Sequence, residues 1–178
     1  MQKIISFLPE FYLTVNVSLE QLSDDGLLTF IPQILKEYQL DGSYLVIEMT
    51  ESCMDKQPSR LSHLMRVCKE LGVRLALDDF GTGYSSLRVL LQYPTDIIKS
   101  DRSLLLEMTE SEDKSNFIYS VVFACHQYGK KVCVEGVETA EQKVLVQNAH
   151  CDMIQGFFYY RPTELEDMYQ LVQDHQIL

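Results

Sequence analysis

Residues 77–87, with the sequence LDDFGTGYSSL, place two adjacent carboxylates between an apolar run and a glycine-containing loop. Three interpretations compete for Asp78 and Asp79: a tight turn without chemistry, a kinase-like DFG metal loop, or the rim of a different metal site. The kinase interpretation fails, because the chain has no glycine-rich phosphate loop, no V-A-I-K lysine strand and no H-R-D motif. Gly81 and Gly83 suit a tightly turning loop, since glycine tolerates backbone angles that other residues avoid.

Polar side chains also end the other apolar, strand-like runs of the sequence. They are Asn16 and Ser18, Glu48 and Glu51, Lys99 and Asp101, Glu135 and Glu138, and Gln155. With the two aspartates they form an oxygen-rich set without histidine, which suits Mg²⁺ or Mn²⁺ better than zinc. Converging carboxylates repel one another, so a bound cation would keep them ionised. Two such ions about 3.5–4 Å apart are a recurrent solution for phosphodiester hydrolysis.

Lys99 is the cation of this predicted set. One interpretation is structural, with Lys99 forming a salt bridge to Asp101 or Asp79. The other is functional, with the ammonium orienting a water molecule or stabilising developing negative charge. The sequence leaves both interpretations open.

The elements that must position these residues follow a repeating pattern, in which a short apolar β-rich run precedes a longer amphipathic stretch. Strands are expected at residues 12–17, 44–49, 73–77, 95–100, 131–134 and 152–158. Helices are expected at residues 26–38, 58–71, 85–91, 114–128, 140–148 and 164–173. This alternation predicts an α/β fold with a parallel sheet. Because every expected strand ends in polar residues, the pattern favours a β/α barrel over an open doubly wound sheet. Such a barrel needs eight strands, and six are found.

Composition narrows the class of protein. The 178 residues are 46% hydrophobic, which is enough for one domain, residues 1–178, with a buried core. The net charge of −11 disfavours binding to duplex nucleic acid. Five scattered cysteines without a C-x-x-C motif indicate reduced thiols in a cytoplasmic protein. No apolar run approaches the roughly 20 residues of a membrane helix. Pro9 and Glu10 interrupt the first apolar stretch, so no signal peptide is expected.

Several motifs now resemble one known family. They are VNVSLEQL (15–22), VIEMTES (46–52), LALDDFGTGYSSL (75–87), YPTDIIKSDRSL (93–104), VEGVET (134–139) and QGFFYYRP (155–162). In this order they resemble the EAL domain, a bacterial phosphodiesterase module that hydrolyses cyclic di-GMP (c-di-GMP) to linear pGpG. The resemblance implies a TIM-like β/α barrel that holds two Mg²⁺ or Mn²⁺ ions.

The resemblance also implies roles for individual residues. Metal ligands are expected at Asn16, Glu48, Asp78 and Asp79, with Asp101 and Gln155 supporting metal-bound waters. Lys99 matches the catalytic lysine near the attacking water, and Glu135 matches the glutamate that holds a metal or that water. Glu51 is expected to anchor a loop, while Gly81 and Gly83 let it turn, and Glu138 occupies a motif position without a clear role. Tyr159, Arg161 and Pro162 are expected either to line a guanine pocket or to cap the barrel mouth.

One departure from the family pattern affects the expected activity. No E-A-L or E-V-L motif precedes Asn16, although the family places a metal-binding glutamate there. We therefore expect an incomplete barrel that lacks its N-terminal strands, and weak or absent hydrolysis by this chain alone. The alternative is a degenerate, non-catalytic module that senses c-di-GMP or binds a protein. Expected partners are c-di-GMP, a second copy of the chain, an upstream sensor or GGDEF-type domain, or a chain that completes the barrel.

Overall fold

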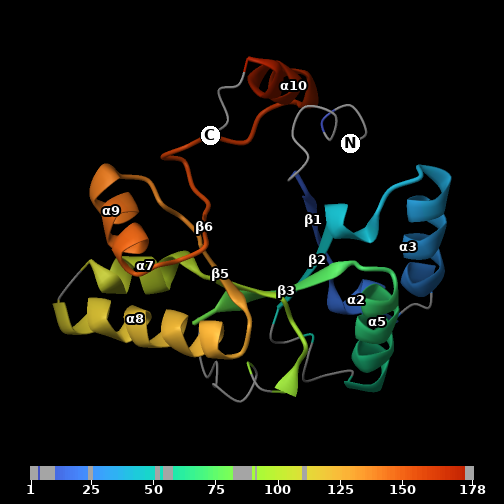
Figure 1. The fold of residues 1–178 in the computed structure, drawn as a ribbon, viewed down its shortest axis with the longest axis horizontal. Helices are drawn as coiled ribbons and strands as arrows, with labels where there is room; N and C mark the ends of the chain where they lie inside the picture. The colour runs from blue at the N-terminus through green and yellow to red at the C-terminus, as the bar shows by residue number, and fades with distance from the viewer. Residues whose placement is uncertain are drawn as a thin grey trace.

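The computed structural model describes residues 4, 11–23, 26–50, 53, 58–81, 90, 92–109 and 112–174. Six strands form one sheet in the order β1 to β6, and every neighbouring pair is parallel. The strands are β1 (Leu13–Asn16), β2 (Leu45–Thr50), β3 (Arg74–Phe80), β4 (Ile97–Ser100), β5 (Lys131–Val134) and β6 (Met153–Ile154). Figure 1 shows the sheet curving into a half-barrel, which confirms the predicted α/β fold with six strands of a TIM-like barrel.

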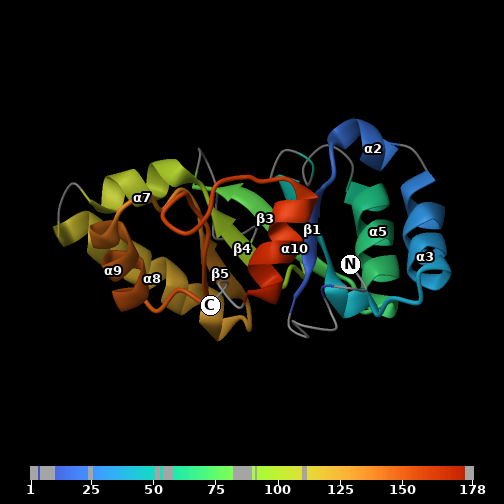
Figure 2. The ribbon, with the colours of Figure 1, turned by 90° about the horizontal axis from the view of Figure 1, so that it is seen from above.

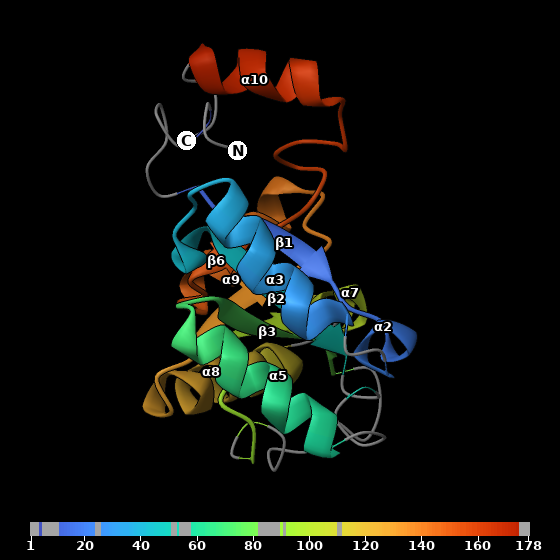
Figure 3. The same cartoon turned by 90° about the vertical axis from the view of Figure 1, so that its right-hand side faces the viewer.

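The described helices are α2 (Leu19–Ser23), α3 (Gly26–Glu37), α5 (Pro58–Glu70), α7 (Arg102–Met108), α8 (Glu112–Gln127), α9 (Ala140–Asn148) and α10 (Leu165–Gln173), with a 3₁₀ turn at Gly42–Tyr44. All of these helices except α10 cover the convex side of the sheet, in two groups (Figure 2). In Figure 2, α2, α3 and α5 lie on one side and α7, α8 and α9 on the other. Helix α10 stands apart, over the concave side between β1 and β6 (Figures 1 and 3).

Most of the expected elements are confirmed, with corrections to both strands and helices. The expected sixth strand at 152–158 is too long, since β6 spans Met153–Ile154 only, and the third, expected at 73–77, is too short, since β3 runs to Phe80. Helices α2 and α7 were not expected at all, because their five and seven residues are too few to show a helical period. The helix expected at 85–91 falls almost entirely outside the described residues. No described helix is both long and apolar enough to traverse a membrane.

Each face of the sheet carries its own apolar cluster, because successive side chains of a strand point to opposite faces. The larger cluster fills the space between the convex face and the helices and includes Ile47, Leu75 and Ile98. The smaller cluster lies on the concave face. It consists of Val46, Ala76, Ile97 and Cys133, with Tyr12 and Met153 packed against them. This smaller cluster forms an apolar floor beneath the carboxyl ends of the strands.

Tyr12 joins the two edges of the sheet across the concave face. Its hydroxyl donates to Met153 Sδ on β6 over 2.9 Å, although the two residues are 141 positions apart in the chain. The Arg74 guanidinium stacks over the Tyr12 ring at 4.2 Å from its centroid. Tyr12 therefore fills the floor at the point where the sheet does not close by strand pairing.

Strand β1 is an edge of the sheet and is poorly covered. Leu13 and Val15 are 46% and 40% exposed. Together with Phe30 of α3 they line an almost wholly apolar groove of about 350 Å³. An exposed strand edge beside apolar side chains is a position that proteins usually protect.

Candidate active site

Three carboxylates from different strands converge on the ammonium group of Lys99. Lys99 Nζ lies 2.6 Å from Glu135 Oε1, 2.7 Å from Glu48 Oε2 and 3.4 Å from Asp78 Oδ1. Glu48 belongs to β2, Asp78 to β3 and Lys99 to β4, and Glu135 directly follows β5. Strand alternation places all four on the concave face, one layer above the apolar floor. We call these four residues the Lys99 cluster.

The Lys99 cluster is buried, and its carboxylates outnumber its single ammonium group. Glu48 is 2% exposed and Lys99 is 7% exposed. Three carboxylates surround one ammonium group, so two negative charges are not compensated within the cluster. Glu48 Oε1 is buried and accepts no hydrogen bond from any described residue. A buried carboxylate oxygen without a partner is costly, unless a cation or a water molecule approaches it.

Burial and charge shift the pKa values of two cluster members. Burial raises the pKa of the Glu135 carboxyl above its ordinary value, and the nearby Lys99 ammonium only partly offsets this effect. Burial alone would lower the pKa of Lys99, but its contacts with Glu135 and Glu48 outweigh burial and raise that pKa. Lys99 is therefore fully protonated at neutral pH. The salt-bridge partners expected from the sequence, Asp101 and Asp79, are wrong, because Lys99 pairs with Glu48, Asp78 and Glu135 instead.

Asp79 lies beside the cluster on a strained backbone. Its φ of 57° is left-handed, and the β3–β4 register shifts between Leu77 and Phe80. Burial, Asp78 and Asp101 together raise the pKa of the Asp79 carboxyl. Gly81, with φ of 106°, continues the turn in a conformation that favours glycine. Strain of this kind within a group of carboxylates is common at functional sites.

Asp101 performs a structural task that the sequence analysis missed. It is the N-cap of α7, and its side chain accepts a 2.8 Å hydrogen bond from Ser103 N. Hydrogen bonds from Ser103 lower the pKa of the Asp101 carboxyl. Aspartate is a residue type preferred at helix N-caps, so the sequence offered a signal here. However, no periodic apolar run follows Asp101 to mark a helix.

Asn16 and Gln155 lie at the same carboxyl-end edge but outside the Lys99 cluster. Asn16 ends β1 opposite Glu48 in the strand register, and both line one cavity of about 370 Å³. Gln155 directly follows β6, where its backbone N–H donates to Val134 O over 2.9 Å. Neither of the two described side chains bonds to the cluster. The two expected residues Glu51 and Gly83 lie outside the described residues.

Glu138 pairs with a residue that the sequence analysis did not select. Arg102 Nη2 donates to Glu138 Oε2 over 2.8 Å, at a half-exposed position. The Arg102 side chain passes so close to Gly136 that an added Cβ would lie 2.6 Å from Arg102 Cγ. Glu138 thus fixes the loop after β5, which carries Glu135, against the start of α7.

The three residues expected at the substrate end are all exposed. Tyr159, Arg161 and Pro162 follow β6, and the guanidinium of Arg161 lies 4.6 Å from the centre of the Phe157 ring. Tyr159 packs edge-on against Phe158, with ring centres 5.3 Å apart. The segment thus presents flat aromatic rings and one guanidinium group, which are groups that can stack on a nucleobase.

The donor set fits a hard cation, although the ammonium holds the central position. In the part of the chain that the structure describes, no three His, Cys, Asp or Glu side chains are arranged to hold a metal ion. The carboxylates instead point at Lys99. The unpartnered Glu48 oxygen and the purely carboxylate and amide chemistry nevertheless match Mg²⁺ or Mn²⁺.

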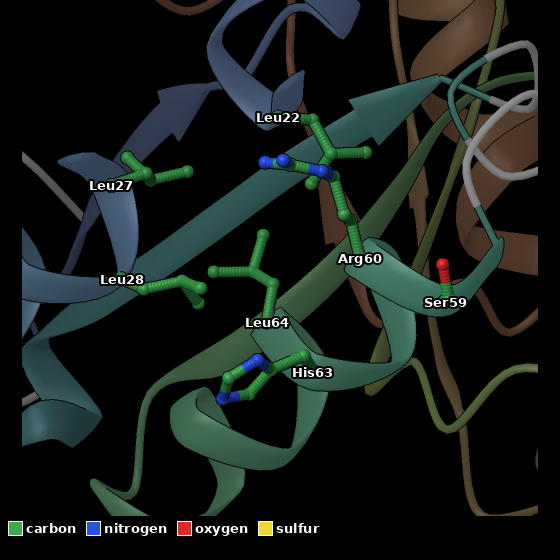
Figure 4. Close-up of a pocket in the computed structure, with 7 residues that line it drawn as sticks. All are labelled: Leu22, Leu27, Leu28, Ser59, Arg60, His63 and Leu64. Atoms are coloured by element: carbon green, nitrogen blue, oxygen red, sulfur yellow. The ribbon is translucent and has the colours of Figure 1, made fainter. Parts of the chain in front are cut away.

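A separate pocket of about 250 Å³ lies on the convex side between α2, α3 and α5. Figure 4 shows Arg60 and His63 of α5 beside leucines of α2, α3 and α5. The described lining contains no carboxylate, so this pocket is not part of the site.

Comparison with known proteins now defines the class. The model of the EAL domain family matches residues 1–162, and the chain belongs to that family. The signaling protein YkoW of Bacillus subtilis is 36% identical over 159 residues, which are 89% of this chain and 20% of YkoW. The chain spans about a fifth of the length of the curated relatives it matches.

Two solved structures with bound nucleotide have the same fold. The PaMucR phosphodiesterase in complex with c-di-GMP is 30% identical, with a TM-score of 0.82, covering 90% of this chain and 65% of that chain. Klebsiella pneumoniae BlrP1 in complex with manganese and c-di-GMP is 29% identical, with a TM-score of 0.80, covering 90% and 42%.

Proposed function

We propose that this chain is a c-di-GMP phosphodiesterase domain, which hydrolyses one phosphodiester bond to give pGpG with the help of two Mg²⁺ or Mn²⁺ ions. The observation that carries the proposal is the convergence of Glu48, Asp78 and Glu135 on Lys99 at the carboxyl-end edge of an EAL half-barrel. The c-di-GMP complex of PaMucR and the manganese complex of BlrP1 support the choice of substrate and metal. We also propose that residues 1–178 form a single, partial EAL unit.

The proposed metal ligands are Asn16, Glu48, Asp78 and Asp79, with Asp101 and Gln155 supporting bound waters and Glu51, Gly81, Gly83 and Glu138 supporting the loops. When bound, the ions supply Lewis acidity to the scissile phosphate and lower the pKa of a water molecule. The family's substrate is a dianion, so carboxylates alone would repel it.

Two residues of the chain act directly on the reacting groups in this proposal. Glu135 accepts a proton from the attacking water, a role that suits a carboxylate whose pKa is raised towards neutral pH. Lys99 donates hydrogen bonds to the negative charge that develops on the phosphate. Tyr159, Arg161 and Pro162 contact a guanine base.

The test is the formation of pGpG by the natural protein that contains residues 1–178, measured chromatographically with Mg²⁺ or Mn²⁺. Glu135→Ala and Asp78→Ala are expected to lower the rate by at least about 100-fold, since the first removes the proton acceptor and the second removes a proposed metal ligand. Glu70→Ala, an exposed acid at the end of α5, is the control and should retain wild-type activity. Binding of c-di-GMP without hydrolysis in either metal would contradict the proposal.

One observation favours a second candidate function. The described carboxylates surround the ammonium of Lys99 and do not leave an empty position that a metal ion could occupy. In this alternative the chain binds c-di-GMP or a protein without hydrolysis. Capture of c-di-GMP by both the wild-type protein and Glu135→Ala, with no pGpG from either, would support it.

Partners beyond c-di-GMP are part of the proposal. Pseudomonas aeruginosa MucR is named as a bifunctional diguanylate cyclase and c-di-GMP phosphodiesterase. We propose that this chain likewise works beside a GGDEF-type or sensor domain, in the cytoplasm. We also propose that a homodimer or a partner chain covers the open sheet. Light scattering of the natural protein would test the dimer.

A further inference from the structure

Lys99 Nζ lies within one group of acids and donates a hydrogen bond to Glu48 Oε2. An ammonium group has three N–H donors, and Glu135, Glu48 and Asp78 lie at 2.6, 2.7 and 3.4 Å from it. Each acid belongs to a different strand or strand end, so a single cation links β2, β3, β4 and the loop after β5. Removal of that cation would leave three buried or half-buried carboxylates facing one another.

A second buried lysine shows that this arrangement is not a general consequence of burial. Lys130, which is 5% exposed, lies at the amino end of β5. Its Nζ donates to Tyr93 O, Thr95 O and Thr95 Oγ1 over 2.8 to 3.0 Å. All three acceptors are uncharged. Among the described residues, one buried lysine therefore pairs with acids and another holds a loop by hydrogen bonds to uncharged groups.

We infer that Lys99 is a built-in counter-ion that holds the carboxylates together in the absence of metal and competes with metal ions for the same oxygen atoms. The inference rests on the proposed function for its choice of Mg²⁺ and Mn²⁺ as competitors. Glu48 Oε1 is buried, has no hydrogen-bond partner among the described residues and lies outside the ion pairs of Lys99, so it is the oxygen that a metal ion would find available first. Lys99 acts in this role as a positioning residue.

The physical reason is electrostatic. Coulomb repulsion between carboxylates a few ångströms apart is strong where water is excluded. A cluster without any cation would be driven apart by this repulsion, which would destroy the geometry that a metal needs. An internal ammonium keeps the three acids in place, but it occupies oxygen atoms that a bound metal would also need.

The test compares Lys99→Met, Lys99→Arg and Lys130→Met by thermal unfolding in EDTA and in excess Mn²⁺, together with calorimetric Mn²⁺ binding. Lys99→Met should unfold at a lower temperature than wild type in EDTA and recover most of this loss in Mn²⁺. It should also bind Mn²⁺ about tenfold more tightly. Lys99→Arg, which keeps the charge, should unfold close to wild type in EDTA. Lys130→Met should lose stability equally in both conditions.

A double variant keeps the test decisive if Lys99→Met does not fold. Glu135→Gln removes one of the repelling charges, so it should restore folding to Lys99→Met in EDTA. The inference is overturned if Lys99→Met is as stable as wild type in EDTA, or if Glu135→Gln destabilises Lys99→Met further. If neither wild type nor Lys99→Met binds Mn²⁺, the proposed hydrolysis and the competition with metal ions both fail. Loss of stability of Lys99→Met in EDTA would then support only the part of the inference in which Lys99 holds the carboxylates together.

Discussion

At the scale of single residues, the geometry of the loop after β5 depends on a glycine. Gly136 has φ of 74°, and the Arg102 side chain occupies the space that a Cβ would take. Arg102 in turn binds Glu138, two residues further along the same loop. The position of Glu135 within the Lys99 cluster therefore depends on a residue that carries no chemistry of its own.

We predict that Gly136→Ala lowers the free energy of unfolding by about 2 kcal/mol, through left-handed backbone strain and displacement of Arg102. Gly72→Ala is the matched control, because Gly72 has the same φ of 74° and no atom within 4 Å of an added Cβ. Urea unfolding should show a smaller loss for Gly72→Ala, of about 1 kcal/mol. Equal losses would mean that the contact with Arg102 is immaterial.

At the scale of secondary structure, two exposed aspartates, Asp96 and Asp152, hold neighbouring strands together at their amino ends. Asp96 Oδ2 accepts from Leu75 N, and Asp152 Oδ2 accepts from Val132 N, both over 2.8 Å. His126 Nε2 of α8 lies 2.8 Å from the same Asp152 oxygen. Each aspartate thus links its own strand start to the adjacent strand.

Asp152 gives a prediction on pH. Burial alone would raise the pKa of the Asp152 carboxyl, but the hydrogen bonds from Val132 N and His126 and the nearby Lys131 outweigh burial and lower it. A carboxyl whose pKa is lowered in the folded state adds stability above its unfolded pKa of about 3.9. That stability is lost as pH falls through the lower folded value.

We therefore expect the stability of the wild type to fall more steeply than that of Asp152→Asn as pH is lowered from about 5 to 2. Chemical unfolding at several pH values would measure the two slopes. Glu166→Gln, on the exposed part of α10, should keep the wild-type slope. A parallel pair of curves for wild type and Asp152→Asn would show that Asp152 does not contribute in this way.

At the scale of the whole molecule, the two described edge strands of the half-barrel, β1 and β6, do not pair with each other, so other contacts must hold the two edges in position. Tyr12 performs this function on the floor, since it contacts Met153 and Arg74 and packs with the small apolar cluster. The two edge strands are linked by side chains there and by no strand pairing among the described residues.

We predict that Tyr12→Ala destabilises the protein by about 3 kcal/mol, because it removes a large, half-buried aromatic ring from the floor. Tyr12→Phe, which removes only the hydroxyl contact with Met153, should cost about 1 kcal/mol or less. Urea unfolding of both variants would measure these losses. Tyr12→Ala as stable as Tyr12→Phe would show that the ring does not support the half-barrel.

The sequence predicted much of this molecule for clear physical reasons. The polar residues at strand ends gave a larger set that includes Glu48, Asp78, Lys99 and Glu135, the four that the structure brings together. The roles expected of individual residues came from the resemblance to the EAL family. The partners of Lys99 were wrong, because they depend on the curvature and register of the sheet, which no local pattern encodes. Helix α7 and the cap at Asp101 were missed for a related reason, since a helix of two turns leaves too little periodicity.

The unpaired edge of β1 has one further consequence. Asn16 and Glu48 lie opposite each other in the parallel register of β1 and β2. Any polypeptide that added itself in parallel to β1 would extend this row and set a new side chain next to Asn16. A strand added at this edge would thereby also determine which side chain lies next to the candidate site.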